Sequence, residues 1–148
     1  MRAALSASSS TLEWPDWVPA ERERMSINVI VIDDTKHVLE MLVSLLTLDG
    51  FNIVGHGDSG AKAIELAANH NPDVMVIDYA MAGMDGLEAS RRILADTPEQ
   101  NIILSTAYVD KALKQKAAAA GVALCVGKAE GLETLERSIC ELCLQLGK

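Results

Sequence analysis

The sequence has no excess of basic residues and no long apolar run. Lysine and arginine number 13, against 21 aspartate and glutamate residues, so the formal net charge is −8. A chain that binds nucleic acid presents a basic face to the phosphates, and this composition disfavours that class of protein. No stretch approaches the roughly 18 consecutive apolar residues of a membrane span. We therefore expect no direct nucleic-acid binding and no insertion into a membrane.

The sequence also lacks a secretory signal and paired cysteines. Residues 1–14 contain no apolar block of roughly 7–15 residues, the core of a signal peptide. Three cysteines are present, Cys125, Cys140 and Cys143, and an odd number without a signal peptide is typical of free thiols. The single C-x-x-C pair falls in a predicted helix and gives only weak support to a redox or metal site. These features favour a cytoplasmic location.

Residues 1–25 differ in composition from the rest of the chain. They contain a serine-rich run, two prolines and both tryptophans of the chain, Trp14 and Trp17. Because no apolar period is sustained, the segment predicts a flexible N-terminal extension outside the fold. The alternative is that the tryptophan pair docks on this domain, on a second copy or on a partner. Residues 26–148 are predicted to form one domain of ordinary size.

From residue 27 onward, short apolar runs alternate with segments of helical periodicity. Apolar runs predict buried strands over residues 29–32, 51–54, 74–77, 102–104 and 123–126. Helical spacing, with caps and stop residues, predicts helices over residues 35–49, 59–69, 86–97, 110–120 and 131–146. This alternation predicts a doubly wound α/β domain with a parallel sheet and helices on both faces.

Polar residues follow the ends of four predicted strands. They are Asp33 and Asp34 after the first, Asp78 after the third, Thr106 after the fourth and Lys128 after the fifth. The carboxyl ends of parallel strands meet at one rim, where ligands of such domains bind. Each residue alone is equally well a cap, a turn residue or a solvated charge. Their joint placement at one rim favours a functional site.

Three carboxylates and an ammonium at one rim predict magnesium-dependent phosphoryl chemistry. Neighbouring carboxylates repel one another, and a hard divalent cation offsets that repulsion. An oxygen-only ligand set suits Mg²⁺ and disfavours zinc. The Lys128 ammonium, the Thr106 hydroxyl and a nearby backbone N–H complete the positive charge and donors that a transferring phosphoryl group needs. Asp78 is then the nucleophile that forms an acyl phosphate.

Five separated motifs carry this chemistry: VIVIDD, VMVIDYAMAGMDG, ILSTAY, AAAAGV and CVGKA. In order and spacing they resemble the receiver domain of two-component response regulators, over about residues 27–146. The resemblance implies a flavodoxin-like fold with strand order 2-1-3-4-5, and phosphate taken from a histidine kinase or a phosphotransfer protein. By position it implies Asp78 as phosphoacceptor, a Mg²⁺ site made by Asp33, Asp34, Asp78 and the Ala80 carbonyl, and phosphoryl sensing by Thr106, Ala107 and Lys128.

Three positions depart from that family's pattern. Ala82 stands where the family often has a proline, and Ala129 replaces the proline that usually follows the lysine. A cis bond before a non-proline residue costs roughly 3 kcal/mol, so we expect a trans bond before Ala129 or an altered loop. Cys125 occupies the position of the usual switch tyrosine or phenylalanine, which predicts a weaker or different conformational switch.

Two residues near the site are expected to tune the lifetime of a phosphoryl group. Ala80 and Tyr108 lie two residues beyond Asp78 and Thr106, where a side chain can help or hinder a hydrolytic water. Ala80 has no polar group, and Tyr108 can shield the phosphoryl group. We therefore expect slow self-dephosphorylation.

The expected output is contact with a downstream protein. The Lys-Ala ending and the GLEASRRI stretch resemble receivers that carry a helix-turn-helix output domain, although only two residues follow Leu146. Both a stand-alone receiver and a piece of a longer regulator fit. The last two helices (residues 110–120 and 131–146) offer a candidate homodimer surface, but core packing is the first explanation of the leucine stripe.

Two other functions stay open at this point. One is a pseudo-receiver that binds partners without phosphorylation. The other is a phosphohydrolase that forms an aspartyl phosphate, which usually needs a second aspartate where Ala80 stands.

Overall fold

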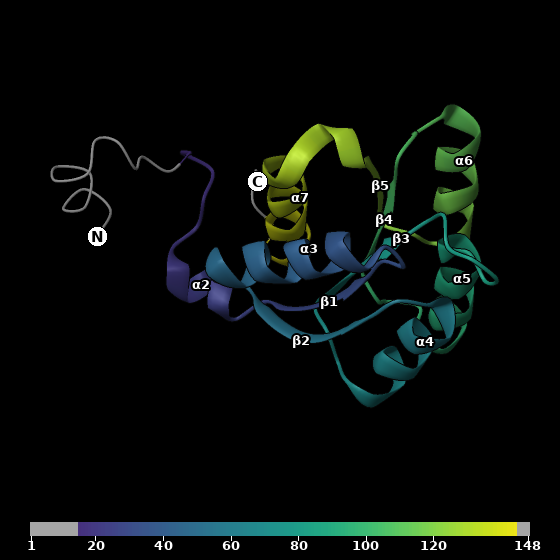
Figure 1. Cartoon of the computed structure of the whole chain (residues 1–148). Helices are drawn as coiled ribbons and strands as arrows, with labels where there is room; N and C mark the ends of the chain where they lie inside the picture. The colour runs from purple at the N-terminus through teal and green to yellow at the C-terminus, as the bar shows by residue number, and fades with distance from the viewer. Residues whose placement is uncertain (1–14, 145–148) are drawn as a thin grey trace, which may run out of the picture.

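A five-stranded parallel sheet forms the centre of the structure, a computed structural model that describes residues 15–144 (Figure 1). The strands are β1 (Asn28–Ile32), β2 (Asn52–Gly57), β3 (Val74–Asp78), β4 (Ile102–Thr106) and β5 (Leu124–Gly127). Their order in the sheet is β2-β1-β3-β4-β5, and each neighbouring pair is parallel. The predicted flavodoxin-like topology is confirmed.

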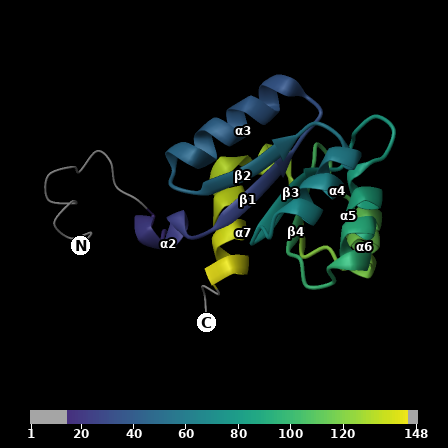
Figure 2. The same cartoon turned by 90° about the horizontal axis from the view of Figure 1, so that it is seen from below.

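Helices cover both faces of this sheet (Figures 1 and 2). They are α2 (Glu21–Met25), α3 (Lys36–Leu48), α4 (Gly60–Asn69), α5 (Gly86–Asp96), α6 (Lys111–Ala120) and α7 (Gly131–Leu144), with the short 3-10 helix η2 (Lys128–Glu130) before α7. One face carries α3 and α7, and the other carries α4, α5 and α6. Among residues 15–144, no helix combines the length and apolar character needed to cross a lipid bilayer.

The alternation of side chains along β1 divides the core into two layers. Ile30 and Ile32 point into the core beneath α4, α5 and α6. Val29 and Val31 point into the core beneath α3 and α7. All four are at most 1% exposed. A strand buried on both faces needs apolar residues at every position, and for this reason the strands read as continuous apolar runs.

The first turn of α5 packs against the end of β3 and fixes where Asp78 lies. Gly86 donates a backbone hydrogen bond of 2.8 Å to the carbonyl of Tyr79. A Cβ atom at position 86 would collide with the backbone carbonyl of Asp78. The Asp85 side chain caps the helix by accepting 2.8 Å from the Glu88 N–H. The approach therefore depends on a glycine directly after the cap.

Residues 15–25, which the sequence analysis assigns to the flexible extension, lie against the domain in the structure. They form a turn and helix α2 beside the C-terminal end of α3 (Figure 2). Val18 and Arg24 are 6% and 8% exposed. The Trp17 indole donates 3.2 Å to Glu133 on α7 and lies under the Arg137 guanidinium, 5.8 Å from the ring centroid. Trp17 therefore docks on this domain, which is the alternative to a flexible extension. Trp14 lies outside the described residues.

Candidate functional site

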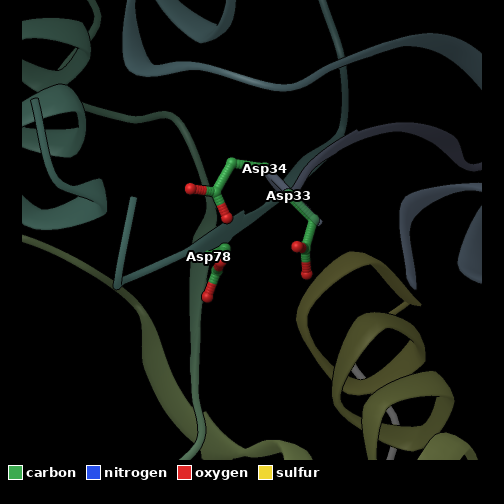
Figure 3. Close-up of side chains that lie close together, drawn as sticks. All are labelled: Asp33, Asp34 and Asp78. Carbon is green, nitrogen blue, oxygen red and sulfur yellow. The ribbon is translucent and has the colours of Figure 1, made fainter. Parts of the chain in front are cut away.

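The carboxylates predicted for the site gather at the carboxyl ends of β1 and β3 (Figure 3). Asp33 and Asp34 directly follow β1, and Asp78 is the last residue of β3. One oxygen from each carboxylate lies within 4.8 Å of the others. Asp33 and Asp78 are 2% and 4% exposed, whereas Asp34 is exposed. The oxygen-only donor set, open to solvent on the Asp34 side, fits a hard divalent cation such as Mg²⁺.

Lys128, directly after β5, bridges the two buried carboxylates. Its Nζ lies 3.0 Å from Asp33 Oδ2 and 3.2 Å from Asp78 Oδ1. The Lys128 side chain keeps 32% of its surface exposed, so the ammonium reaches the site from the solvent side. Three carboxylates against this one ammonium leave an excess of negative charge at the rim. A divalent cation would balance that excess.

The electrostatics of the cluster raise the pKa of Asp78 above its ordinary value. Burial is the largest cause, followed by the negative charge of Asp33, while the hydrogen bond and charge of Lys128 oppose them. The pKa of Lys128 is also raised: burial lowers it, but hydrogen bonds to Asp33 and Asp78 outweigh that effect. The ammonium is therefore held charged, and it favours the ionised form of Asp78.

Backbone N–H groups orient two of the carboxylates. Thr35 donates 2.9 Å to Asp33 Oδ1, and Ala82 donates 3.3 Å to Asp34 Oδ2. Sequence reasoning missed Ala82 as a site residue. The signal was present, because an alanine in place of the family's proline supplies a backbone N–H that proline lacks.

Thr106 is the last residue of β4, the strand that pairs with β3. In that pairing Asp78 lies opposite Ser105, the residue before Thr106. Thr106 is 5% exposed, and its hydroxyl lies 3.3 Å from both the N–H and the carbonyl of Tyr108. The hydroxyl is thus engaged with its own loop. Ala107 is exposed, and Tyr108 is 75% exposed, with its ring mostly in solvent.

The remaining predicted positions are Ala80, next to the rim, and Cys125, which lies inside β5 and away from the carboxylates. Ala80 is exposed in the loop that follows β3. Cys125 is half-buried on β5 and packs against the core beneath α4, α5 and α6. Burial raises the pKa of the Cys125 thiol. A neutral thiol on that side of β5 has neither the size nor the hydroxyl of a tyrosine.

The loop between β5 and α7 forms a short 3-10 turn. The Lys128–Ala129 peptide bond is trans, since the described residues contain no cis bond, and the prediction for this bond is confirmed. The Glu130 carboxylate accepts 2.8 Å from the Gly127 N–H. Sequence reasoning missed Glu130, although its place three residues after a turn glycine is the spacing of a capping box.

Comparisons with known proteins agree with this geometry. The response regulator receiver domain family matches residues 29–139. The response regulator GacA of Pseudomonas aeruginosa is 32% identical over 114 residues, which cover 76% of this chain and 53% of GacA. The signal receiver domain of NarL from Mycobacterium tuberculosis superposes with a TM-score of 0.71 at 32% identity, covering 82% of this chain and 98% of that chain.

A third similar protein was solved with bound ligands. TrrA of Thermotoga maritima, in complex with Mg²⁺ and BeF, has a TM-score of 0.70 at 25% identity and covers 78% of this chain and 98% of that chain. The present chain spans about half the length of the curated relatives it matches, 53% in the case of GacA. The match over residues 29–139 and these relatives show that the chain belongs to the response regulator receiver domain family of two-component systems.

Proposed function

We propose that this domain accepts a phosphoryl group on Asp78, with Mg²⁺ held by Asp33, Asp34, Asp78 and the Ala80 carbonyl. The observation that carries the proposal is the position of the Asp78 carboxylate, 3.2 Å from the Lys128 ammonium and grouped with the two carboxylates after β1. Bound Mg²⁺ supplies positive charge to the oxygens of the transferring group. A TrrA structure that contains Mg²⁺ and BeF supports this assignment.

The residues of the chain have separate roles in the transfer. A carboxylate oxygen of Asp78 attacks the phosphorus atom of a phosphohistidine on the donor protein. The bond between phosphorus and the histidine nitrogen breaks, and its electron pair stays on that nitrogen. The Lys128 ammonium balances the charge of one phosphoryl oxygen. The Thr106 hydroxyl and the Ala107 N–H hold another, which requires the hydroxyl to leave its 3.3 Å contacts with Tyr108. That movement links phosphorylation to the loop after β4.

The phosphodonor proposed is a histidine kinase or a phosphotransfer protein. An apolar groove of about 200 Å³ runs between α3 and α7 and opens beside Lys128. Its apolar lining includes Met41, Leu42, Leu45, Leu132 and Leu135. An amphipathic helix of the donor that packs here would bring its phosphohistidine to the rim. Phosphorylation then alters contacts with a downstream protein, in the cytoplasm.

A homodimer through α6 and α7 is part of the same proposal. The two helices lie on opposite faces of the sheet, on either side of the edge strand β5 (Figure 1). Leu124, on β5, is an exposed apolar side chain at that edge. Light scattering before and after phosphorylation measures the oligomeric state. A protein that is monomeric both before and after phosphorylation would contradict the proposed dimer.

The test of the main proposal is intact-mass measurement after incubation with acetyl phosphate and Mg²⁺. The wild type should gain one phosphoryl group, Asp78→Asn should gain none, and the exposed-site control Asp96→Asn should behave as the wild type. A wild type that stays unmodified with several small phosphodonors contradicts the proposal and favours the pseudo-receiver. Rapid multiple turnover of the phosphodonor would favour a phosphohydrolase. Ala80 argues against that function, because its side chain has no acid or base group.

A further inference from the structure

The ammonium of Lys128 reaches the two buried carboxylates from a side chain that is 32% exposed. Packing therefore covers the side chain only in part, and its direction also depends on the backbone at the start of η2. That backbone is flanked by Gly127, whose lack of a Cβ gives it unusual conformational freedom. The Gly131 N–H closes the 3-10 turn by donating to the Lys128 carbonyl, and the Gly127 end of the turn needs a contact of its own.

Glu130 makes that contact. Its Oε2 accepts a hydrogen bond of 2.8 Å from the Gly127 N–H, so the first and last groups of the turn around Lys128 are joined. A Cβ at position 127 would lie 3.2 Å from Glu130 Oε2 and 3.3 Å from Val109 Cγ2. The carboxylate thus lies directly over the glycine, in space that any side chain at position 127 would fill.

Glu130 does not act by pairing with the lysine. Among the ion pairs of residues 15–144, Lys128 pairs with Asp33 and Asp78, whereas Glu130 accepts from the backbone on the other side of the turn. The role proposed for Glu130 therefore depends on a hydrogen-bond acceptor at this place, which a neutral amide oxygen can also supply.

We propose that Glu130 is a positioning residue for phosphoryl transfer: by closing the turn from Gly127, it holds the Lys128 ammonium at Asp33 and Asp78. The inference rests on the proposed function for its consequence on phosphorylation, but not for its consequence on Lys128. Without the Glu130 carboxylate, the Gly127 end of the turn is released and only the Gly131 bond remains, so the ammonium spends more time in solvent, away from both carboxylates.

The experiment uses the full chain with three substitutions. Glu130→Ala removes the acceptor, Glu130→Gln keeps a neutral oxygen acceptor in place, and Glu99→Ala removes one exposed negative charge elsewhere. The first readout is the rate at which acetic anhydride acetylates Lys128, relative to exposed Lys111 in the same protein, by peptide mass mapping. The second is the initial rate of phosphorylation by acetyl phosphate with Mg²⁺.

In Glu130→Ala we expect acetic anhydride to acetylate Lys128 about fivefold faster than in the wild type. We expect acetyl phosphate to phosphorylate the same variant about fivefold more slowly, the size of one lost hydrogen bond. Glu130→Gln should stay within about twofold of the wild type, and Glu99→Ala should match it, because both leave the turn closed.

Unchanged labelling of Lys128 in Glu130→Ala overturns the inference, as does faster labelling without slower phosphorylation. A Gln variant as impaired as the Ala variant overturns it too, because charge and not the hydrogen bond would then be responsible. A wild type that is never phosphorylated defeats the proposed function, while the labelling still decides whether Glu130 holds Lys128.

Discussion

The guanidinium of Arg24 donates a hydrogen bond of 2.6 Å from Nε to the backbone carbonyl of Asp49. Asp49 is the C-cap of α3, where unpaired carbonyls and the helix dipole favour a cation. A second bond of 2.6 Å runs from Nη1 to the carbonyl of Pro19. This buried arginine therefore ties the segment before β1 to the end of α3.

Removing the Arg24 guanidinium should destabilise the domain. Arg24→Met leaves buried carbonyls without a donor, and we expect the free energy of unfolding to fall by about 2–3 kcal/mol. Urea unfolding measures it, with Arg22→Met on the exposed side of α2 as the control. Equal effects of the two substitutions would show that the Arg24 hydrogen bonds contribute nothing to stability. Gly50→Ala should also destabilise, because φ at Gly50 is +103° and a Cβ there lies 3.2 Å from Arg24 Nε.

Glu136 should make stability depend on pH near neutrality. Its Oε2 is buried and has no hydrogen-bond partner among residues 15–144. Burial first, and then the Asp49 carboxylate, raise its pKa from 4.5 to about 8, although Arg24 opposes them. Between these values the unfolded chain has lost the proton that the folded domain keeps, so the free energy of unfolding falls as pH rises from 4.5 towards 8. Protonated Glu136 can donate to Asp49, which the ionised form cannot.

The measurement is the urea midpoint from pH 5 to 9 for the wild type and Glu136→Gln. The glutamine cannot ionise, so the variant should gain relative stability as pH rises through this window. Parallel curves for the two proteins would mean that Glu136 ionises in the folded domain as it does in the unfolded chain.

The sequence predicts those parts of this fold in which burial is either continuous along a strand or periodic along a helix. The central strands were placed correctly because β1, β3 and β4 need apolar residues on both faces. β2 extends to Gly57, beyond the predicted residue 54, because the strand lies at the sheet edge, where the half-buried position of Gly55 and the exposed position of His56 need no apolar side chain. Glycine and histidine there carry no strand signal.

The parts that could not be predicted depend on single long-range contacts. Helix α2 has the sequence ERERM, which has no apolar period, and its position depends on Arg24 meeting the end of α3. In the site, the placement of Asp33, Asp34, Asp78 and Lys128 follows from strand endings, which the topology brings to one rim. The backbone donors and acceptors that orient them depend on loop conformation, which residue type does not determine.

The hydrogen bond from Ala82 to Asp34 should affect metal binding. Ala82→Pro removes the N–H that lies 3.3 Å from Asp34 Oδ2, and the exposed carboxylate loses orientation. We expect Mg²⁺ affinity to fall about threefold, measured by calorimetry, as for a weak hydrogen bond. Ala82→Gly keeps the N–H and serves as the control. Equal affinities for the proline and glycine variants would show that the N–H has no part in metal binding.

The ionisation of Asp78 should depend in opposite directions on its two charged neighbours. In the Mg²⁺-free domain its pKa lies above 3.8, raised by burial and by Asp33 and lowered by Lys128. Lys128→Met should therefore raise the pKa of Asp78 further, and Asp33→Asn should lower it, as followed by carboxyl ¹³C NMR titration.

Because the pKa of Asp78 in the folded domain exceeds that in the unfolded chain, the Mg²⁺-free domain loses stability as pH rises from 3.8 through the folded value. Mg²⁺ should reverse that loss by favouring the carboxylate. An Asp78 pKa that neither substitution moves would mean that neither charge acts on it.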